Sequence, residues 1–495
     1  MAATLSVALV GCSSDDKAGR NTDGGTVRVV AQNEPVSLNA IYSSVSDAKS
    51  WGALYDGLVG NNPATNEVND EGLLYGWERP DATTWIFKVR EGVTFHNGEV
   101  FDAAAAAFTI LTERDEPKAN LGLFYQDIVD AKPVGNDLEI TTSEPYPPLP
   151  SLLASTMAIA PGAYAKLGGD GFGAAPVGTG PFKFVSYDRG GTLRLDAYKD
   201  YWRVKPAAAS LEVSWSADAQ TRVGLVQTGQ ADLALDLTPQ ALTSLRDDGS
   251  VEVKRAPIQS RYYLYLNTKE GAFIDLDLRR AFAMAIDRDA IVASVFKQGG
   301  AEAYRHFFGD LYDPELTFDN SIKYDLKAAQ QIVSSKGSPK ITLTYANGRA
   351  PNDGQIGTAV VGMLEAAGFT VTNDQVEFST FLERRNSHAT EAAGMQIINT
   401  YPDPDDMVKA WAGGFSITQA CAGEWYDAKE SKALSAASDD ERDAHYRDIE
   451  NQVLNEEVCY VPLVKYEGIW AMNPKLSGFT EPRIGATDYA LLKIG

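Results

Sequence analysis

The sequence predicts an α/β protein built from two or three lobes. A β-α-β pattern in the second half is the main sign: residues 341–345 read as a strand, and residues 369–371 resume extended structure. Between them Ile356, Val360 and Leu364 recur at helical spacing, and Gly368 suits the C′ position. A length of 495 residues exceeds one ordinary core, and 44% hydrophobic residues fit a well-buried protein.

The first half of the chain predicts further strands and a capped helix. Residues 27–31 form an apolar strand, and residues 84–90 alternate between apolar and polar side chains. Asp102 is placed to N-cap an alanine-rich helix over residues 103–112. The Gly- and Pro-rich stretch 168–181 predicts a loop at a lobe boundary.

Three more elements are predicted towards the C-terminus. Leu278, Phe282 and Ile286 recur at helical spacing, and Asp289 is predicted to cap a second short helix. An apolar strand is expected at residues 461–464. It follows an amphipathic helix whose apolar positions are Tyr446, Ile449 and Val453.

The charge of the chain excludes several classes of partner. Lys and Arg number 44 against 67 Asp and Glu, so the net charge is −23. This sign argues against nucleic acid, whose phosphates need a basic surface, and against electrostatic adhesion to anionic lipid. The acids are scattered along the chain, which predicts a solvated, soluble surface and a monomer.

The first residues predict an export signal and a lipid anchor. Residues 2–10 are apolar but shorter than the roughly 20 residues that a membrane span needs. The string LVGC at residues 9–12 resembles the bacterial lipobox, which implies cleavage and lipidation at Cys12 after a signal segment 1–12. Residues 13–25 have almost no apolar side chain and predict a flexible tether. The protein is therefore expected outside the cytoplasm, anchored to the membrane through Cys12.

The other two cysteines, Cys421 and Cys459, leave two interpretations open. They form one disulfide in an oxidising compartment, or they are two buried thiols, because spacing alone does not give the geometry. No CxxC pair and no metal-ligand spacing occur, and only four histidines are present. We therefore expect no metal site and no cofactor.

A series of short motifs resembles the bacterial extracellular solute-binding proteins of family 5, the peptide- and nickel-binding partners of ABC importers. The motifs follow in order over most of the chain. They are EPVSLN (34–39), LYDGLV (54–59), TWIFKVREGVTFHNGEVF (84–101), VGTGPFKF (177–184), DYW (200–202), QTGQAD (227–232), LRRAFAMAIDRDAI (278–291) and YPDPD (401–405). Most of these residues are expected to build the scaffold: the glycines of VGTG allow tight backbone turns, and His96 is expected to be structural.

The resemblance implies a periplasmic-binding-protein-like clamp of the cluster C type, with two main lobes of mixed sheets joined by a hinge. Lobe I would comprise residues 26–58, 176–260 and 465–495, and lobe II residues 261–464. An inserted subdomain would comprise residues 59–175. These ranges define the names used below. A ligand that touches both lobes binds the closed form better, and this difference in affinity closes the hinge.

The implied function is capture of an extracytoplasmic solute, a short peptide above all, and its delivery to the permease subunits of an ABC importer. In peptide-binding relatives, an aspartate just before the YPDP-like segment pairs with the α-ammonium of the peptide. Here Thr400 stands at that position, and Asp403, Asp405 and Asp406 are candidates to replace the missing charge. Arg385 is a candidate clamp for a carboxylate or phosphate, or else a partner of Glu383.

The full set of predicted ligand-binding residues combines positions near the implied cleft with aromatic candidates for its wall. They are Tyr42, Ser43, Trp51, Tyr125, Phe378, Arg385, Ile398, Asn399, Thr400, Tyr401, Asp403 and Trp411.

Two alternative ligands and one alternative class of protein remain. Oligosaccharides stack on Trp and Tyr in some relatives. A nickel or other metal chelate would bind here through Arg and aromatic side chains, because four histidines without an HxxxH or HExxH pair do not favour direct coordination. A secreted hydrolase is the different class, but the sequence contains no GxSxG, no GxxxxGK[ST] and no dinucleotide fingerprint. We therefore expect a binding protein rather than an enzyme.

Overall fold

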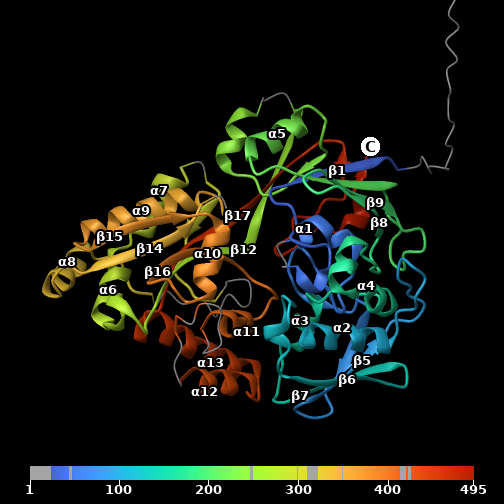
Figure 1. Ribbon diagram of the computed structural model, residues 1–495, viewed down its shortest axis with the longest axis horizontal. Coiled ribbons are helices and arrows are strands. Elements are labelled where there is room, and N and C mark those ends of the chain that lie inside the picture. Colours follow the sequence, from blue (N-terminus) through green and yellow to red (C-terminus); the bar gives the residue numbers. More distant parts are fainter. Residues whose placement is uncertain are drawn as a thin grey trace, which may run out of the picture.

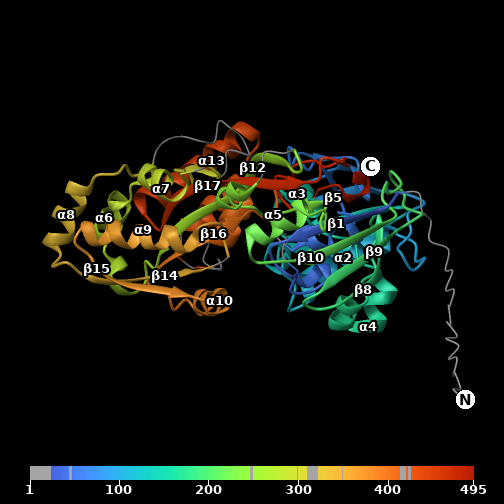
Figure 2. The ribbon, with the colours of Figure 1, turned by 90° about the horizontal axis from the view of Figure 1, so that it is seen from above.

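The structure is a computed structural model that describes residues 24–43, 47–245, 249–297, 299–308, 321–347, 349–412, 418, 420–421, 425–485 and 487–495. Two bodies lie side by side and are joined by two long strands, β12 (Glu252–Leu266) and β17 (Tyr460–Met472) (Figure 1). Seen from above, the molecule is elongated, with lobe II at one end and lobe I with the inserted subdomain at the other (Figure 2).

One mixed sheet runs through both bodies, as the α/β prediction requires. Its strands in spatial order are β15 (Thr370–Val376), β14 (Lys340–Ala346), β16 (Ala392–Ile398), β12, β17, β11 (Leu233–Ala234), β1 (Thr26–Ala31), β10 (Ser210–Trp215), β9 (Thr192–Ala197) and β8 (Phe182–Tyr187), with β13 (Ala301–Ala303) paired to β17. Parallel pairs flank β1 and β14, and the remaining pairs are antiparallel.

The strands β12 and β17 change partners midway, where the two bodies meet. Residues 252–257 of β12 pair with residues 467–472 of β17, and residues 261–265 pair with residues 460–465. The register shifts between Pro257 and Arg261, so the ladder is interrupted at this crossing. Such an interruption lets a sheet bend locally, here at the point where the two bodies meet.

The β-α-β unit predicted in lobe II is confirmed. Strands β14 and β15 are parallel, with α9 (Asp353–Ala366) between them in the chain, and its Ile356, Val360 and Leu364 are fully buried. Gly368 lies one residue beyond the C-cap with a φ of 97°, a conformation that glycine adopts without strain. The other helices of lobe II are α6 (Leu276–Ala285), α7 (Arg288–Val295), α8 (Leu326–Ser335), α10 (Phe378–Asn386), α11 (Pro404–Met407), α12 (Trp425–Leu434) and α13 (Asp439–Asn451).

The inserted subdomain contains an antiparallel sheet in the order β4 (Leu74–Glu78), β5 (Thr84–Val89), β7 (Asp137–Thr142) and β6 (Ile128–Val134). Strand β5 is the predicted half-buried strand, with Trp85, Phe87 and Val89 buried. Its helix α2 (Ala103–Asp115) begins where expected, because the carboxylate of Asp102 accepts a hydrogen bond of 2.9 Å from the backbone N of Ala105.

Further α-helices and short strand pairs belong to lobe I and to the inserted subdomain. They are α1 (Ala48–Trp51), α3 (Leu149–Ala154), α4 (Pro161–Ala174) and α5 (Ala219–Gln227), and the paired strands β2 (Gly60–Asn61) with β3 (Val68–Asn69) and β18 (Leu476–Ser477) with β19 (Lys493–Ile494).

Three predictions of local structure were wrong. Helix α4 covers half of the stretch 168–181 that was expected to be a loop: Gly168 alone leaves the helical conformation, and the buried ring of Phe172 holds the next turn in place. The second short helix of lobe II, α7, is capped by Asp287 rather than Asp289. Ile286 is buried but lies after α6 ends, so the helical spacing overran the true end.

The VGTG turn shows why its glycines are required. A Cβ at Gly178 would lie 2.1 Å from the backbone O of Leu54, and one at Gly180 would lie 2.5 Å from the backbone C of Leu54. The glycines therefore permit a close approach of two backbones. The His96 backbone N donates to Gly178 O at 2.9 Å, and its ring nitrogen lies 2.9 Å from Gly180 O. Burial lowers the pKa of His96 to about 4, so the ring is a neutral structural group, as expected.

The exact lobe boundaries remain a prediction, although both boundaries of lobe II fall inside the crossing strands β12 and β17. Among the helices of the described residues, none is long and apolar enough to span a membrane. The predicted signal segment, Cys12 and most of the tether lie outside the described residues.

Candidate functional site

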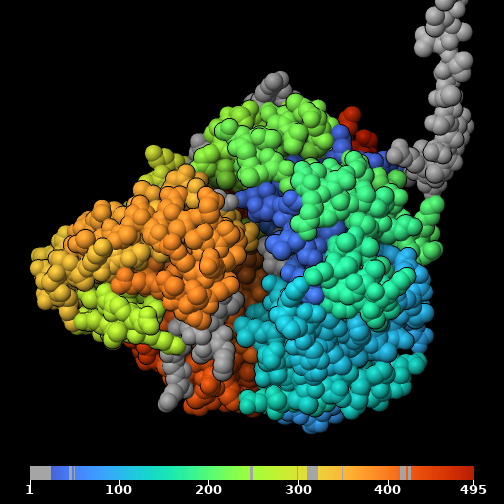
Figure 3. Space-filling view, viewed as in Figure 1, coloured from blue at the N-terminus to red at the C-terminus, as the bar shows by residue number. Residues whose placement is uncertain are grey.

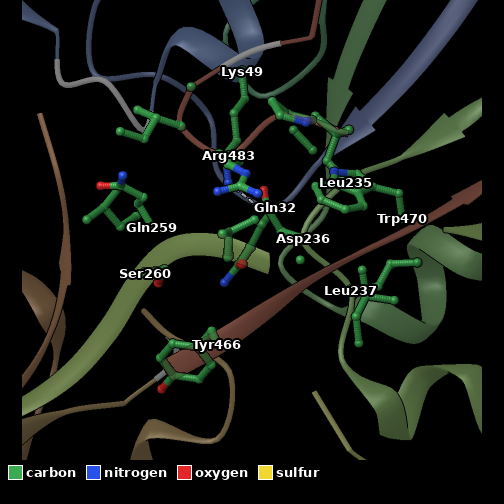
Figure 4. A pocket seen from close by; sticks show the side chains of 18 of the residues that line it. Gln32, Lys49, Leu235, Asp236, Leu237, Gln259, Ser260, Tyr466, Trp470 and Arg483 are labelled. Carbon is green, nitrogen blue, oxygen red and sulfur yellow. Dashed lines mark hydrogen bonds and ion pairs between the residues drawn. The ribbon is translucent and has the colours of Figure 1, made fainter. Parts of the chain in front are cut away.

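A cavity of about 100 Å³ lies at the crossing of β12 and β17 and has walls from both lobes. Lobe I contributes the end of β1, the start of α1, the segment after β11 and the C-terminal loop 479–489. Lobe II contributes Arg349, Pro351, Gln396 and Ile398. Figure 3 shows the surface hollowed between the orange side of lobe II and the blue and cyan residues opposite, and Figure 4 shows the cavity from close by.

The interrupted ladder of β12 shapes one wall of this cavity. Because Gln259 has no partner on β17, its backbone N donates instead to Arg483 O of the C-terminal loop at 2.9 Å. The amide of Gln396 on β16 donates to the hydroxyl of Ser260 at 2.6 Å. The crossing is thus tied to the C-terminal loop on one side and to lobe II on the other, which places polar groups of both lobes around the cavity.

An ion pair between Lys49 and Asp236 lies on the lobe I side of the cavity. Asp236 has a φ of 54°, a left-handed conformation that Asp tolerates better than most residues. The buried guanidinium of Arg222 fixes it by donating to the carbonyl groups of Leu235 and Asp236. Desolvation raises the pKa of Asp236, but Lys49, Arg222 and Arg349 together hold it below its ordinary value. The cavity therefore contains a fixed carboxylate that stays ionised.

Arg349 is the corresponding charged group of lobe II. It follows β14, lines the cavity, and holds its guanidinium 5.0 Å from the ring centre of Phe378. Because it also lowers the pKa of Asp236 across the gap, the two lobes attract each other electrostatically at this point.

A second set of contacts joins lobe II to the inserted subdomain. Lys409 donates to Asp127 at 2.5 Å and lies 4.3 Å from the ring centre of Tyr146. The hydroxyl groups of Tyr146 and Tyr401 are 3.2 Å apart. The hydroxyl of Ser155 donates to the backbone O of Thr400 at 2.7 Å. The lobes therefore meet on this side of the molecule, beside the cavity.

The segment 399–406 is held by a buried carboxylate. Asp406 accepts hydrogen bonds from the Asn399 amide at 2.7 Å and from the backbone N of Thr400 at 3.1 Å, and Arg261 donates to Asn399 at 2.6 Å. Burial raises the pKa of Asp406 to about 7, although these hydrogen bonds oppose the shift. Thr400, which the sequence analysis placed at the ammonium-binding position, is thus fixed by a neighbouring acid.

This pKa predicts a pH-dependent stability. The folded protein binds a proton at Asp406 that the unfolded chain has lost above its ordinary pKa of 3.8. The stabilising contribution of Asp406 to the free energy of unfolding is fully present below pH 3.8. It is lost as the pH rises through about 7. We expect Asp406→Asn to lack this loss, so that the variant gains stability relative to the wild type between pH 5 and pH 8. Urea unfolding of both proteins across this range measures the difference, and parallel curves would contradict it.

The predicted site residues fall into three groups. In the first group, Ile398 lines the cavity and Phe378 contacts Arg349. Four more residues of this group lie in the segment 399–406, which follows Ile398: Asn399, Thr400, Tyr401 and Asp403. Ser43 and Trp51 line a second cavity of about 490 Å³ between lobe I and the inserted subdomain.

The remaining predicted residues lie among protein groups. They are Tyr42, whose ring is 5.4 Å from the Lys118 ammonium; Tyr125, hydrogen-bonded to Thr156; Arg385, bonded to Asn386; and Trp411, whose backbone O accepts from Tyr460. The ligand-binding role of all twelve residues stays a prediction.

Sequence reasoning missed Lys49, Asp236, Gln259, Arg349 and Arg483. Each lies outside the motifs that were singled out, and only the topology brings them to one cavity. The register shift of β12 and the left-handed Asp236 have no sequence signal that would have identified them.

Of the two interpretations of the cysteines, the structure shows the disulfide. Cys421 and Cys459 are bonded with their Cα atoms 5.4 Å apart. The bond attaches the segment before α12 to the start of β17. Among the described residues, no cluster of three or more His, Cys, Asp or Glu side chains is placed to hold a metal ion.

The two lobes share one mixed sheet, and a polar cavity lies where the connecting strands β12 and β17 cross. This arrangement is typical of a two-lobed solute-binding protein. Comparison with known families agrees: residues 48–419 match the bacterial extracellular solute-binding proteins, family 5 (middle). The chain therefore belongs to this family, the solute-binding components of ABC importers, and it is an extracytoplasmic binding protein rather than an enzyme.

Relatives and solved structures support the same fold. The di/tripeptide-binding protein 2 of Pseudomonas aeruginosa is 25% identical over 480 residues, which cover 89% of each chain. The periplasmic binding protein DppA of Helicobacter pylori, solved with the peptide STSA, matches with a TM-score of 0.85 and 20% identity over 95% of this chain and 98% of its own. NikA of Staphylococcus aureus, solved with Ni(L-His)2, matches with a TM-score of 0.82 and 19% identity over 95% of this chain and all of its own.

Proposed function

We propose that the protein captures a short peptide between its lobes and delivers it to the permease of an ABC importer. The observation that carries this proposal is that both lobes place charged side chains in one cavity. Arg349 lines it from lobe II, and the ionised Asp236 with its partner Lys49 lines it from lobe I. A short peptide is a zwitterion, and its two ends need opposite charges in one cavity. The peptide-binding relative and the peptide-bound structure with the same fold support this choice of ligand.

The proposal includes a hinge and an anchor. The ladder interruption between Pro257 and Arg261 is the candidate hinge, because fewer backbone hydrogen bonds resist bending there. A lipid on Cys12, at the end of the predicted tether, would keep the protein beside its permease. Mass spectrometry of the protein from membranes of its own host tests the lipid.

The central experiment is calorimetry of the purified protein with a dipeptide such as Ala-Leu, its C-terminal amide, Ni(L-His)2 and a trisaccharide. We expect Ala-Leu to bind unaltered, and the amide to bind far more weakly because Arg349 loses its carboxylate partner. Arg349→Gln should weaken Ala-Leu binding by about thirtyfold or more.

Arg384→Gln is the matched control, because Arg384 pairs with Asp374 on β15 and does not line the cavity. This variant should bind Ala-Leu as the wild type does. Tight binding of the chelate or the sugar without any binding of Ala-Leu would overturn the peptide assignment, and release of a cleaved product would overturn the binding role.

A further inference from the structure

The C-terminal loop places a second cation in the cavity that the peptide proposal does not use. Arg483 is partly buried and lines the cavity, where it lies near Lys49, Gln32 and Asp236 in the view of Figure 4. Within the described part of the chain, its guanidinium has neither a hydrogen bond nor an ion pair with a protein group. A guanidinium held in a cleft without a counter-charge is a ready site for a carboxylate or phosphate.

The position of Arg483 is fixed by its backbone. Its N donates to Pro63 O at 2.8 Å, and its O accepts from Gln259 N at 2.9 Å. These two bonds involve only backbone atoms, so the loop keeps its place without the Arg483 side chain. Replacement of the side chain is expected to leave the fold intact.

The carboxylates that line the cavity are already engaged. Asp236 pairs with Lys49, and Glu467 pairs with Arg255 at 3.0 Å. Asp47 also has an interaction of its own. The positive charge of Arg483 is therefore available to a ligand.

An unsatisfied polar group lies on the same wall. Gln259 is fully buried and lines the cavity, and both atoms of its side-chain amide lack a hydrogen-bond partner among the described residues. Buried amides are almost always satisfied, so the unpaired amide of Gln259 indicates a missing polar partner at this wall of the cavity. Arg483 and Gln259 therefore both contribute polar groups to this one cavity.

We propose that Arg483 and Gln259 form an anion subsite on lobe I, so that the preferred cargo carries a second acidic group besides the carboxylate that faces Arg349. An acidic short peptide is the substrate class that fits. This inference rests on the proposed peptide function and narrows it, because a peptide with a neutral side chain leaves the subsite empty.

The test compares Ala-Glu with its uncharged isostere Ala-Gln by calorimetry on the wild type, Arg483→Gln and Arg483→Lys. We expect Ala-Glu to bind the wild type about tenfold or more tightly than Ala-Gln. Arg483→Gln should weaken Ala-Glu much more than Ala-Gln, so that the difference between the two peptides disappears, and Arg483→Lys should restore part of that difference. Thermal unfolding without ligand checks that the variants fold.

The outcomes separate this inference from the function on which it rests. If Ala-Glu and Ala-Gln bind equally well, or Arg483→Gln weakens both by the same factor, the subsite is wrong and the peptide function stands. Glutarate is the non-peptide probe: if it binds through Arg483 while neither peptide binds, the subsite stands and the peptide function is wrong. Absence of binding by all three probes overturns both.

Discussion

Replacing Arg442 by Met is expected to destabilise the protein by about 3–5 kcal/mol, because it leaves a buried carboxylate without its partner. Arg442 on α13 donates to Asp403 at 2.5 Å, and the two side chains are only 16% and 11% exposed. Burial already raises the pKa of Asp403, although Arg442 opposes the shift. Without the guanidinium, Asp403 has to take up a proton or remain charged in an apolar environment.

The double variant separates charge from packing. Asp403 also caps α11 by accepting from the backbone N of Asp405 at 2.9 Å, a role that Asn can fill. We therefore expect Asp403→Asn combined with Arg442→Met to recover most of the lost stability. Arg194→Met removes exposed pairs with Asp188 and Glu212 and should change stability much less. Urea unfolding at pH 7.5 measures all three, and equal losses for Arg442→Met and Arg194→Met would contradict the argument.

Removing the disulfide between Cys421 and Cys459 is expected to lower the free energy of unfolding by about 4 kcal/mol. The bond closes a loop of 38 residues that contains α12 and α13, so it restricts the unfolded chain strongly. Both cysteines are buried, and the pair therefore also packs in the core of lobe II.

The double variant Cys421→Ala, Cys459→Ala tests this expectation in a Cys12→Ser background. Its unfolding should be insensitive to a reducing agent, whereas the parent with both cysteines should lose a similar amount of stability on reduction. A parent whose unfolding midpoint does not respond to complete reduction would show that the bond contributes nothing. A large effect also agrees with an oxidising compartment, where such bonds persist.

The loss of the pair between Arg442 and Asp403 is expected to affect the contact between lobe II and the inserted subdomain. The segment 400–409 lies between α13 and the inserted subdomain, and it carries Tyr401 and Lys409, which contact that subdomain. Loosening Asp403 at its start therefore releases the side of lobe II that meets the other body. We therefore expect this segment to couple the stability of lobe II to its contact with the inserted subdomain.

The sequence by itself determined the class of the protein and much of its local structure. Amphipathic spacing in residues 356–364, the alternation of β5 and the cap at Asp102 depend on contacts between residues a few positions apart. Local patterns of this kind are visible in one sequence. The ordered motifs likewise identified the family, because they occur over most of the chain.

Only the tertiary structure decided which residues form the cavity. Four charged residues of the cavity are Lys49, Asp236, Arg349 and Arg483, and each is more than a hundred residues from the next along the chain. The crossing of β12 and β17 brings them together. A register shift of a few residues and a left-handed aspartate change the backbone without changing hydrophobic periodicity. Whether two charged side chains face each other depends on their distance in the folded protein. That distance cannot be read from the order of the residues along the chain.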